Sequence, residues 1–244
     1  MTRTVVVYPD AQAVADVTAA RLLITLGDTL ALKERADVVV TGGSVGIATL
    51  AAVPASPLSR SVDWSRVHVW WGDERVVPHG DPDRNEGQAQ EALLSHVPLP
   101  ESNIHRVGSA DDGSSAQSAA EAYQEEISAA GAPQWDVLML GLGPDGHVAS
   151  LFPGHPAFTD PGADVLPVDD SPKPPPSRVS LALSTINRAK QVWIMAAGDT
   201  KAEAVRLCLE GDTHYPGAAV AGSQRTLWLL DVAAAGEAHT PSRE

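Results

Sequence analysis

The chain has 244 residues, 43% of them hydrophobic, which is enough for a sizeable core and typical of a globular protein. Its 31 acidic and 17 basic residues give a formal net charge of −14, which argues against nucleic-acid binding and against docking on an anionic membrane. Any anionic substrate would therefore need a local positive pocket within a negative field.

Short β-branched and apolar runs alternate with helical patterns along the chain. They predict strands at residues 4–8, 37–41, 67–71, 136–140, 178–182, 191–195 and 226–230. They predict helices from an Asp10 cap to about Arg35, from the 42–44 turn to about Ala52, and over 84–95, 114–129 and 200–209. This alternation predicts the α/β class, with a mostly parallel sheet covered by helices on both faces. We expect a single domain over 1–244, with a proline-rich loop at 170–177 and a tail frayed from about residue 233.

The cysteine content and the chain start bear on the cellular compartment. A single cysteine, Cys208, excludes an intramolecular disulfide, and its position favours a small buried residue in a helix. The first eight residues lack a signal-peptide apolar region of normal length, and no apolar run approaches the roughly 20 residues of a membrane span. We therefore expect a cytoplasmic protein.

Residues suited to chemistry gather in the loops that leave the predicted strands. In open parallel sheets, ligands bind outside the carboxyl ends of the strands. The loops at 42–46, 72–78, 141–150 and 198–201 fit this place and carry most of the candidate residues. We therefore expect one site, shared by these four loops.

The first of these loops reads Thr41-Gly-Gly-Ser-Val-Gly46 between a strand and a helix. Free backbone N–H groups at a helix start bind phosphate, and Ser44 can add a hydroxyl donor, so Gly42, Gly43 and Ser44 are predicted to bind substrate. The alternative is a plain strand-to-helix turn with Ser44 as the N-cap. The loop lacks the Gly-Lys-Ser/Thr of a P-loop.

The second loop, Trp71-Gly-Asp-Glu-Arg-Val-Val-Pro78, places two acids and one base at a strand end. Arg75 can grip a phosphate through two parallel hydrogen bonds. Asp73 can bind sugar hydroxyls or align a catalytic partner. For Glu74 the simpler interpretation is a solvated, self-compensating charge.

The third loop, Gly141-Leu-Gly-Pro-Asp-Gly-His-Val-Ala-Ser-Leu-Phe-Pro-Gly154, presents His147 after a glycine-rich turn. A histidine there can act as a general base near neutral pH, and Asp145 can fix its tautomer. Backbone N–H groups up to Gly146 can stabilise an oxyanion. Gly141, Gly143 and Gly146 also spell G-x-G-x-x-G, but nearby prolines leave no room for the long helix that a dinucleotide site requires. The spacing of His147 and His155 matches no metal motif, and Ser150 lies in no nucleophile elbow.

The fourth loop, Gly198-Asp-Thr-Lys-Ala202, opens a predicted helix with a lysine. Lys201 there opposes the helix dipole, so it is either solvated or paired with a bound anion. Arg178 begins the strand after the proline-rich loop and is either a pocket residue or a surface charge.

Taken in order, these four motifs resemble the glucosamine-6-phosphate isomerase/6-phosphogluconolactonase family. The resemblance covers nearly the whole chain to about Asp231, and the 141–154 motif is its specific part. It implies a Rossmann-like fold and hydrolysis of a sugar-phosphate lactone, 6-phospho-D-glucono-1,5-lactone, in the oxidative pentose phosphate pathway. It implies no cofactor and no metal, and we expect a monomer.

The same resemblance implies roles for individual residues. His147 corresponds to the general base, Ser44 with its glycines and Lys201 to phosphate-binding positions, and Arg75 and Arg178 to basic residues that line the pocket. The isomerase branch usually carries Ala-Phe-Asn-Glu-Pro where this chain has Ala149-Ser-Leu-Phe-Pro153. The missing glutamate favours the lactonase branch.

Three other functions remain as alternatives. One is a glucosamine-6-phosphate isomerase/deaminase, and another is a sugar-phosphate-sensing module related to transcription regulators. The predicted first strand leaves no space before it for a DNA-binding helix-turn-helix, and the negative charge opposes that function. The third is an α/β protein whose glycine loops only turn corners.

Overall fold

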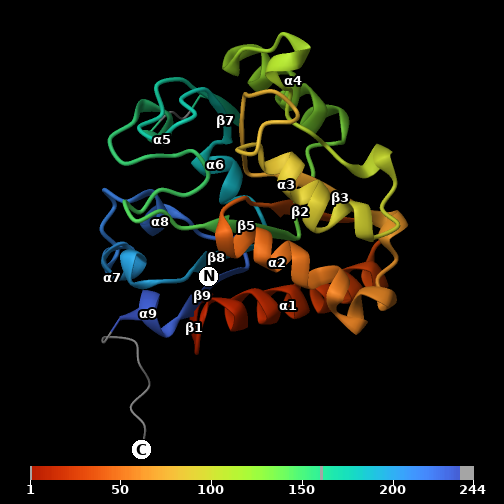
Figure 1. The fold of residues 1–244 in the computed structure, drawn as a ribbon, viewed down its shortest axis with the longest axis horizontal. Coiled ribbons are helices and arrows are strands. Elements are labelled where there is room, and N and C mark those ends of the chain that lie inside the picture. The colour runs from red at the N-terminus through yellow and green to blue at the C-terminus, as the bar shows by residue number, and fades with distance from the viewer. Residues whose placement is uncertain (1, 160–161, 237–244) are drawn as a thin grey trace, which may run out of the picture.

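The computed structural model describes residues 2–159 and 162–236. Its centre is a six-stranded, fully parallel sheet in the order β1-β9-β8-β5-β2-β3 (Figure 1). The strands are β1 (Thr2–Tyr8), β2 (Ala36–Val40), β3 (Val67–Trp71), β5 (Val137–Gly141), β8 (Gln191–Ala196) and β9 (Arg225–Asp231). The α/β class and the parallel sheet are thus confirmed.

Helices cover both faces of this sheet, and successive strand residues divide between two cores. Val38 and Met139 belong to a core that includes α1 (Ala11–Leu32), α2 (Ser44–Ala55) and α3 (Asn85–Ala92). Their neighbours Val39 and Leu138 belong to the other core. The helices on that side are α4 (Ala116–Ala129), α5 (Pro156–Thr159), α6 (Leu183–Ile186), α7 (Ala202–Glu210), α8 (Pro216–Ala219) and α9 (Val232–Ala235). Because side chains alternate across a strand, apolar runs such as residues 38–40 contribute to both cores.

The start of α1 and the environment of Cys208 both agree with the sequence predictions. Asp10 caps α1 by accepting a hydrogen bond from the backbone N–H of Ala13 at 2.8 Å, as the sequence predicted. Cys208 is fully buried in α7, and burial raises the pKa of its thiol to about 11. The thiol therefore stays protonated and packs as a small apolar side chain. Among the described residues, no helix combines the length and apolar character needed to cross a membrane.

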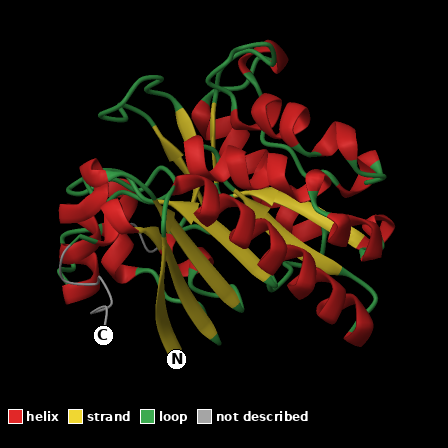
Figure 2. Cartoon of the chain, turned by 60° about the horizontal axis from the view of Figure 1, so that its bottom comes forward, coloured by secondary structure: helices red, strands yellow, loops and turns green. Residues whose placement is uncertain are grey.

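A second, antiparallel sheet was not predicted. Its order is β4-β7-β6, with β4 (Asp73–Arg75), β7 (Arg178–Leu181) and β6 (Val165–Val168). Figure 2 shows these short strands rising beside the main sheet. The sequence signal failed because β4 consists only of charged residues and β6 contains a proline. Only the pairing with β7 makes these segments strands.

The chain is not frayed at residues 233–235, where the sequence predicted the start of a frayed tail. Residues 232–235 form α9, capped by Asp231, which accepts a hydrogen bond from the N–H of Ala234 at 2.7 Å. Ala234 and Ala235 are buried, so fraying from about residue 233 is wrong for these positions. Residues 237–244 lie outside the described part of the chain.

Candidate active site

The four predicted loops meet around one cavity of about 290 Å³ at the carboxyl ends of the parallel strands. The main sheet supplies the loops after β2, β5 and β8, and the second sheet supplies the opposite side. The lining residues come from segments 41–43, 73–75, 141–149, 173–178 and from Asn85 and Lys201. The segment at 173–178 belongs to the proline-rich loop and to β7, so the cavity depends on both sheets.

His147 and Asp145 form a hydrogen-bonded pair on this cavity. The distance from Nδ1 of His147 to Oδ1 of Asp145 is 2.5 Å. Because a carboxylate only accepts, Nδ1 must carry the hydrogen, and Nε2 keeps its lone pair. The turn is closed by the N–H of Gly143, which donates to the carbonyl of His147 at 2.9 Å. A Cβ on Gly143 would lie 1.9 Å from Nδ1 of His147, so this glycine is required by the pair.

The carboxylate of Asp145 stays ionised. Burial by itself would raise its pKa, but hydrogen bonds and charge from His147 and Lys173 hold the pKa well below the usual range. Nζ of Lys173 lies 3.0 Å from Oδ1 of Asp145 and 3.1 Å from Nδ1 of His147. The sequence did not predict Lys173 as a pocket residue, because no local pattern within the proline-rich loop distinguishes it from a surface lysine.

Ser44 is not the N-cap of α2, which corrects the plain-turn alternative. The cap is Gly43, with φ +79, and it makes no side-chain hydrogen bond. The first intrahelical bond runs from the N–H of Ile47 to the carbonyl of Gly43 at 2.9 Å. The earlier N–H groups of the turn therefore point out of the helix start, where an anion can accept them.

Ser44 is exposed and lines a smaller cavity of about 90 Å³ beside the main one. Lys201 borders both cavities. It ends a 3-10 turn (Asp199–Lys201) before α7, and no hydrogen bond or ion pair holds its ammonium within the described part of the chain. Burial, and then the charge of Lys173, lower the pKa of Lys201, while Asp145 opposes this. A bound anion would relieve this repulsion between the two ammonium groups.

Asp73 and Arg75 reach the cavity from β4. Oδ2 of Asp73 accepts a hydrogen bond from Oγ of Ser150 at 2.7 Å, and the aspartate is only 8% exposed. Arg75 donates to the carbonyl of Asp83, while its buried Nε has no partner within the described residues. Arg178 is 4% exposed, and burial lowers its pKa. Its guanidinium lies on the cavity wall beneath the proline-rich loop.

Glu74 is not a solvated charge, which corrects the sequence interpretation. It is 1% exposed and caps α3, because its carboxylate accepts from the N–H groups of Asn85 at 2.8 Å and Glu86 at 2.7 Å. Burial raises the pKa of Glu74 to about 7, against the lowering effects of Arg84 and of backbone hydrogen bonds. This cap joins β4 to α3.

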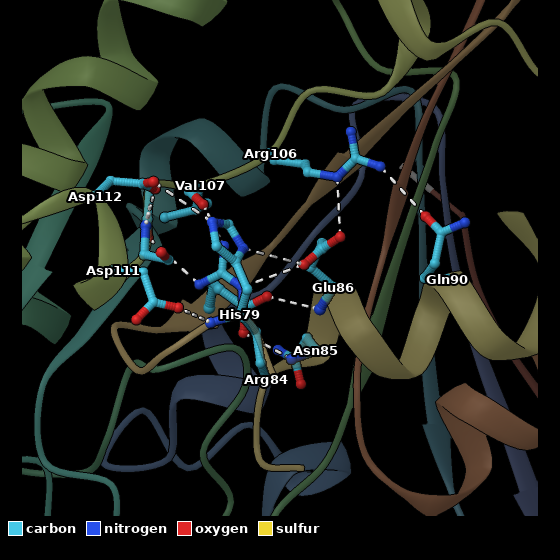
Figure 3. Close-up of polar contacts among 12 residues, drawn as sticks. His79, Arg84, Asn85, Glu86, Gln90, Arg106, Val107, Asp111 and Asp112 are labelled. Carbon is cyan, nitrogen blue, oxygen red and sulfur yellow. Dashed lines mark hydrogen bonds and ion pairs between the residues drawn. The ribbon is translucent and has the colours of Figure 1, made fainter. Parts of the chain in front are cut away.

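A buried ionic network fixes the start of α3 beside the cavity (Figure 3). Arg84 is fully buried, donates to the carbonyl of Val107 at 2.5 Å, and lies 3.3 Å from the carboxylate of Glu86. Arg106 donates to the other oxygen of Glu86 at 2.9 Å. The network holds Asn85 against Gly42, where a Cβ would lie 1.9 Å from the Asn85 amide oxygen. Asn85 was missed from the sequence because only this contact brings it to the site.

Gly146 lies outside both cavities. Its φ is +74, and a Cβ there would lie 2.4 Å from the ring of Tyr215. Its carbonyl accepts a hydrogen bond from the N–H of Gly217 at 3.0 Å. Gly146 therefore supports the turn through contacts with Tyr215 and Gly217, away from the cavities. Within residues 2–159 and 162–236, no cluster of three or more His, Cys, Asp or Glu side chains is arranged to hold a metal ion.

Several known proteins are similar to this chain in sequence and in fold. The 6-phosphogluconolactonase of Streptomyces coelicolor is 46% identical, over 97% of this chain and 95% of its own length. That of Mycobacterium tuberculosis is 40% identical, over 95% and 96%. The solved 6-phosphogluconolactonase of Thermotoga maritima has a TM-score of 0.84 at 27% identity, covering 95% of this chain and 100% of that chain. Residues 9–228 match the model for glucosamine-6-phosphate isomerases/6-phosphogluconolactonase. The chain belongs to the glucosamine-6-phosphate isomerase/6-phosphogluconolactonase family.

Proposed function

We propose that this chain hydrolyses 6-phospho-D-glucono-1,5-lactone to 6-phosphogluconate in the oxidative pentose phosphate pathway, without a cofactor. Relatives named 6-phosphogluconolactonase, 40–46% identical over nearly the full length, support the reaction class. The observation that carries the chemistry is the His147–Asp145 pair on a cavity bordered by basic side chains.

The cavity has the charge that a phosphorylated substrate needs. Arg75, Lys173, Arg178 and Lys201 border it, although the whole chain carries a net charge of −14. The N-terminus of α2 adds partial positive charge from the side of Gly43. We assign the 6-phosphate to the α2 start and Lys201, because these donors have no competing partner within the described residues.

In the proposed reaction, neutral His147 accepts a proton from water at Nε2 while the water oxygen bonds to C1 of the lactone. The N–H groups of Gly143 and Gly146 already donate to carbonyls within the turn, and Pro144 has no N–H. The resulting tetrahedral oxyanion is therefore held by the N–H of Asp145 or by an arginine. The bond between C1 and the ring oxygen then breaks, and the imidazolium returns the proton to that oxygen. The product is the open-chain acid, which ionises at neutral pH. Asp145 stays a carboxylate and stabilises the imidazolium.

A coupled assay tests this function. The lactone is generated in situ, and its hydrolysis is followed through 6-phosphogluconate dehydrogenase after subtraction of the uncatalysed rate. Saturable hydrolysis that depends on His147 is expected, and a purified protein with no rate above background would overturn the proposal. Release of ammonia from glucosamine-6-phosphate would instead assign the chain to the isomerase/deaminase branch.

A further inference from the structure

Lys173 reaches the catalytic pair from a distant part of the chain. It lies between β6 and β7, 28 residues after Asp145 and 26 after His147. Its Nζ is within hydrogen-bond distance of both Oδ1 of Asp145 and Nδ1 of His147, at 3.0 and 3.1 Å. The side chain is 37% exposed, so it is not forced to this place by burial alone.

The backbone around Lys173 is fixed by the buried guanidinium of Arg178. Its Nε donates to the carbonyl of Pro175 at 2.9 Å, and its NH2 group donates to the carbonyls of Lys173 at 3.0 Å and Pro174 at 3.1 Å. The N–H of Lys173 also donates to Oγ of Ser171 at 3.3 Å. These hydrogen bonds hold the backbone of Lys173 in one position, which lowers the entropy cost of placing its ammonium beside Asp145.

The position of the hydrogen on Nδ1 determines which atom accepts a hydrogen bond from the Lys173 ammonium. The 2.5 Å contact between Nδ1 of His147 and Oδ1 of Asp145 needs a hydrogen on Nδ1. A nitrogen that donates its hydrogen has no lone pair left in the ring plane for the ammonium. Lys173 therefore donates to Asp145, and it acts on the imidazole only through that carboxylate.

We propose that Lys173 is a positioning residue, which anchors Asp145 so that His147 keeps its hydrogen on Nδ1 and its lone pair on Nε2. The Asp145 side chain is 36% exposed, and within the described part of the chain its side-chain partners are His147 and Lys173. Without the ammonium, water competes for the carboxylate, and the imidazole gains access to the tautomer that cannot accept a proton at Nε2. This role rests on the proposed general-base function of His147.

The alternative is that Lys173 binds the substrate phosphate together with Lys201. The two roles differ in kinetics, because a substrate contact acts mainly on KM, whereas loss of the reactive tautomer acts on kcat. They also differ without substrate, because only the positioning role changes the histidine tautomer of the free protein.

Lys173→Met, Lys173→Arg and Lys190→Met test the proposal. Lys190 is a matched control, since its Nζ lies 3.0 Å from Oδ1 of Asp136 at the opposite end of β5 and its side chain is 30% exposed. In Lys173→Met we expect kcat to fall roughly tenfold with KM nearly unchanged. Lys173→Arg should recover much of this loss, and Lys190→Met should keep both constants.

The second readout is the ¹⁵N NMR signal of the His147 ring, assigned with His147→Asn. The wild-type and Lys190→Met proteins should show the Nδ1–H tautomer, and Lys173→Met should show a mixture. A wild-type tautomer in Lys173→Met, or a raised KM with kcat intact, would overturn the positioning role. If the tautomer shifts as expected but the wild-type protein has no lactonase activity, the proposed function fails while the assignment of Lys173 to the Asp145–His147 pair stands.

Discussion

The cavity has two walls that are built in different ways. The parallel-sheet wall (residues 41–46, 141–149 and 201) presents backbone turns, the His147 imidazole and the ammonium of Lys201, which has no partner among residues 2–159 and 162–236. The antiparallel-sheet wall (residues 73–75 and 173–178) presents charged side chains whose polar atoms mostly have protein partners. Groups that are already paired hold geometry, whereas groups without partners are free to meet a ligand.

We therefore expect chemistry and phosphate binding on the parallel-sheet wall, and structural support from the antiparallel-sheet wall. The Lys173–Asp145 contact joins them, because it connects the proline-rich loop of one wall to the histidine loop of the other. We expect substitutions on the first wall to affect turnover or binding. On the second wall, substitution of the buried Glu74 should affect stability more than chemistry, whereas Lys173 should affect turnover through its contact with Asp145.

The largest effect is expected for His147→Ala, which removes the proposed general base. We expect kcat to fall by roughly 10²–10⁴, with a smaller change in KM. His155→Ala is the control, because its ring contacts the carbonyl of Asp169 and does not line the cavity. Near wild-type turnover in His147→Ala, measured in the coupled assay, would remove the basis for placing catalysis on this wall.

Gly143→Ala should come next, because its new Cβ would lie 1.9 Å from Nδ1 of His147 and displace the imidazole. Misplacement of a catalytic group by about 1 Å costs on the order of 10² in rate, and we expect kcat to fall by roughly that factor. Gly80→Ala is the matched control, since nothing lies within 4 Å of a Cβ there. Equal kcat in the two variants, with unchanged melting temperatures, would show that the imidazole does not depend on this glycine.

Lys201→Ala should weaken binding more than it slows turnover. Loss of a charged hydrogen bond to phosphate corresponds to roughly a 10- to 100-fold rise in KM or in the Kd for 6-phosphogluconate. Arg206→Ala controls for loss of a positive charge on the adjacent helix α7, because that arginine pairs with Glu203 and Glu210 at the surface. Titration calorimetry measures the Kd. An unchanged Kd for 6-phosphogluconate in Lys201→Ala would mean that Lys201 does not bind the phosphate.

The smallest effect is expected for Glu74→Gln, measured as stability rather than rate. Burial raises the pKa of Glu74 to about 7 in the folded protein, from 4.5 for an ordinary glutamate. The stability that this group contributes is therefore present below pH 4.5 and is lost as the pH rises through 7.

Between pH 5 and pH 8 the wild-type protein should thus lose more free energy of unfolding than Glu74→Gln does, by roughly 2 kcal/mol. Urea unfolding at both pH values measures the difference. Glu121→Gln, at an exposed position of α4, should follow the wild-type protein. A loss of stability that is equal in wild-type and Glu74→Gln would mean that Glu74 is ionised throughout this range.

The sequence predicted the parallel-sheet wall well because its signals are local. A strand followed by Gly42 and Gly43, or by the 141–146 glycines, marks a sharp turn at a strand end. Parallel strands of one sheet then bring such turns to the same edge. The Asp145–His147 pair follows from two positions in one turn, so it too could be anticipated from spacing.

The antiparallel-sheet wall could not be predicted in the same way. Glu74 has the sequence context of a surface charge, yet it is buried because the start of α3 supplies N–H donors 11 and 12 residues later. Lys173 lies in a sequence that predicts a proline-rich loop, yet hydrogen bonds from Arg178 hold that loop so that Lys173 reaches Asp145.

The amino-acid sequence alone thus determined the α/β class, the glycine turns, the pairing of Asp145 with His147 and the family, because each depends on periodicity or on residues close together in the chain. Tertiary structure decided the second sheet, the burial of Glu74 and Arg84, and the arrival of Asn85 and Lys173 at the site. Those features depend on partners far apart in sequence. A charged side chain can be buried only where such a partner compensates its desolvation, and local patterns do not encode where that partner lies.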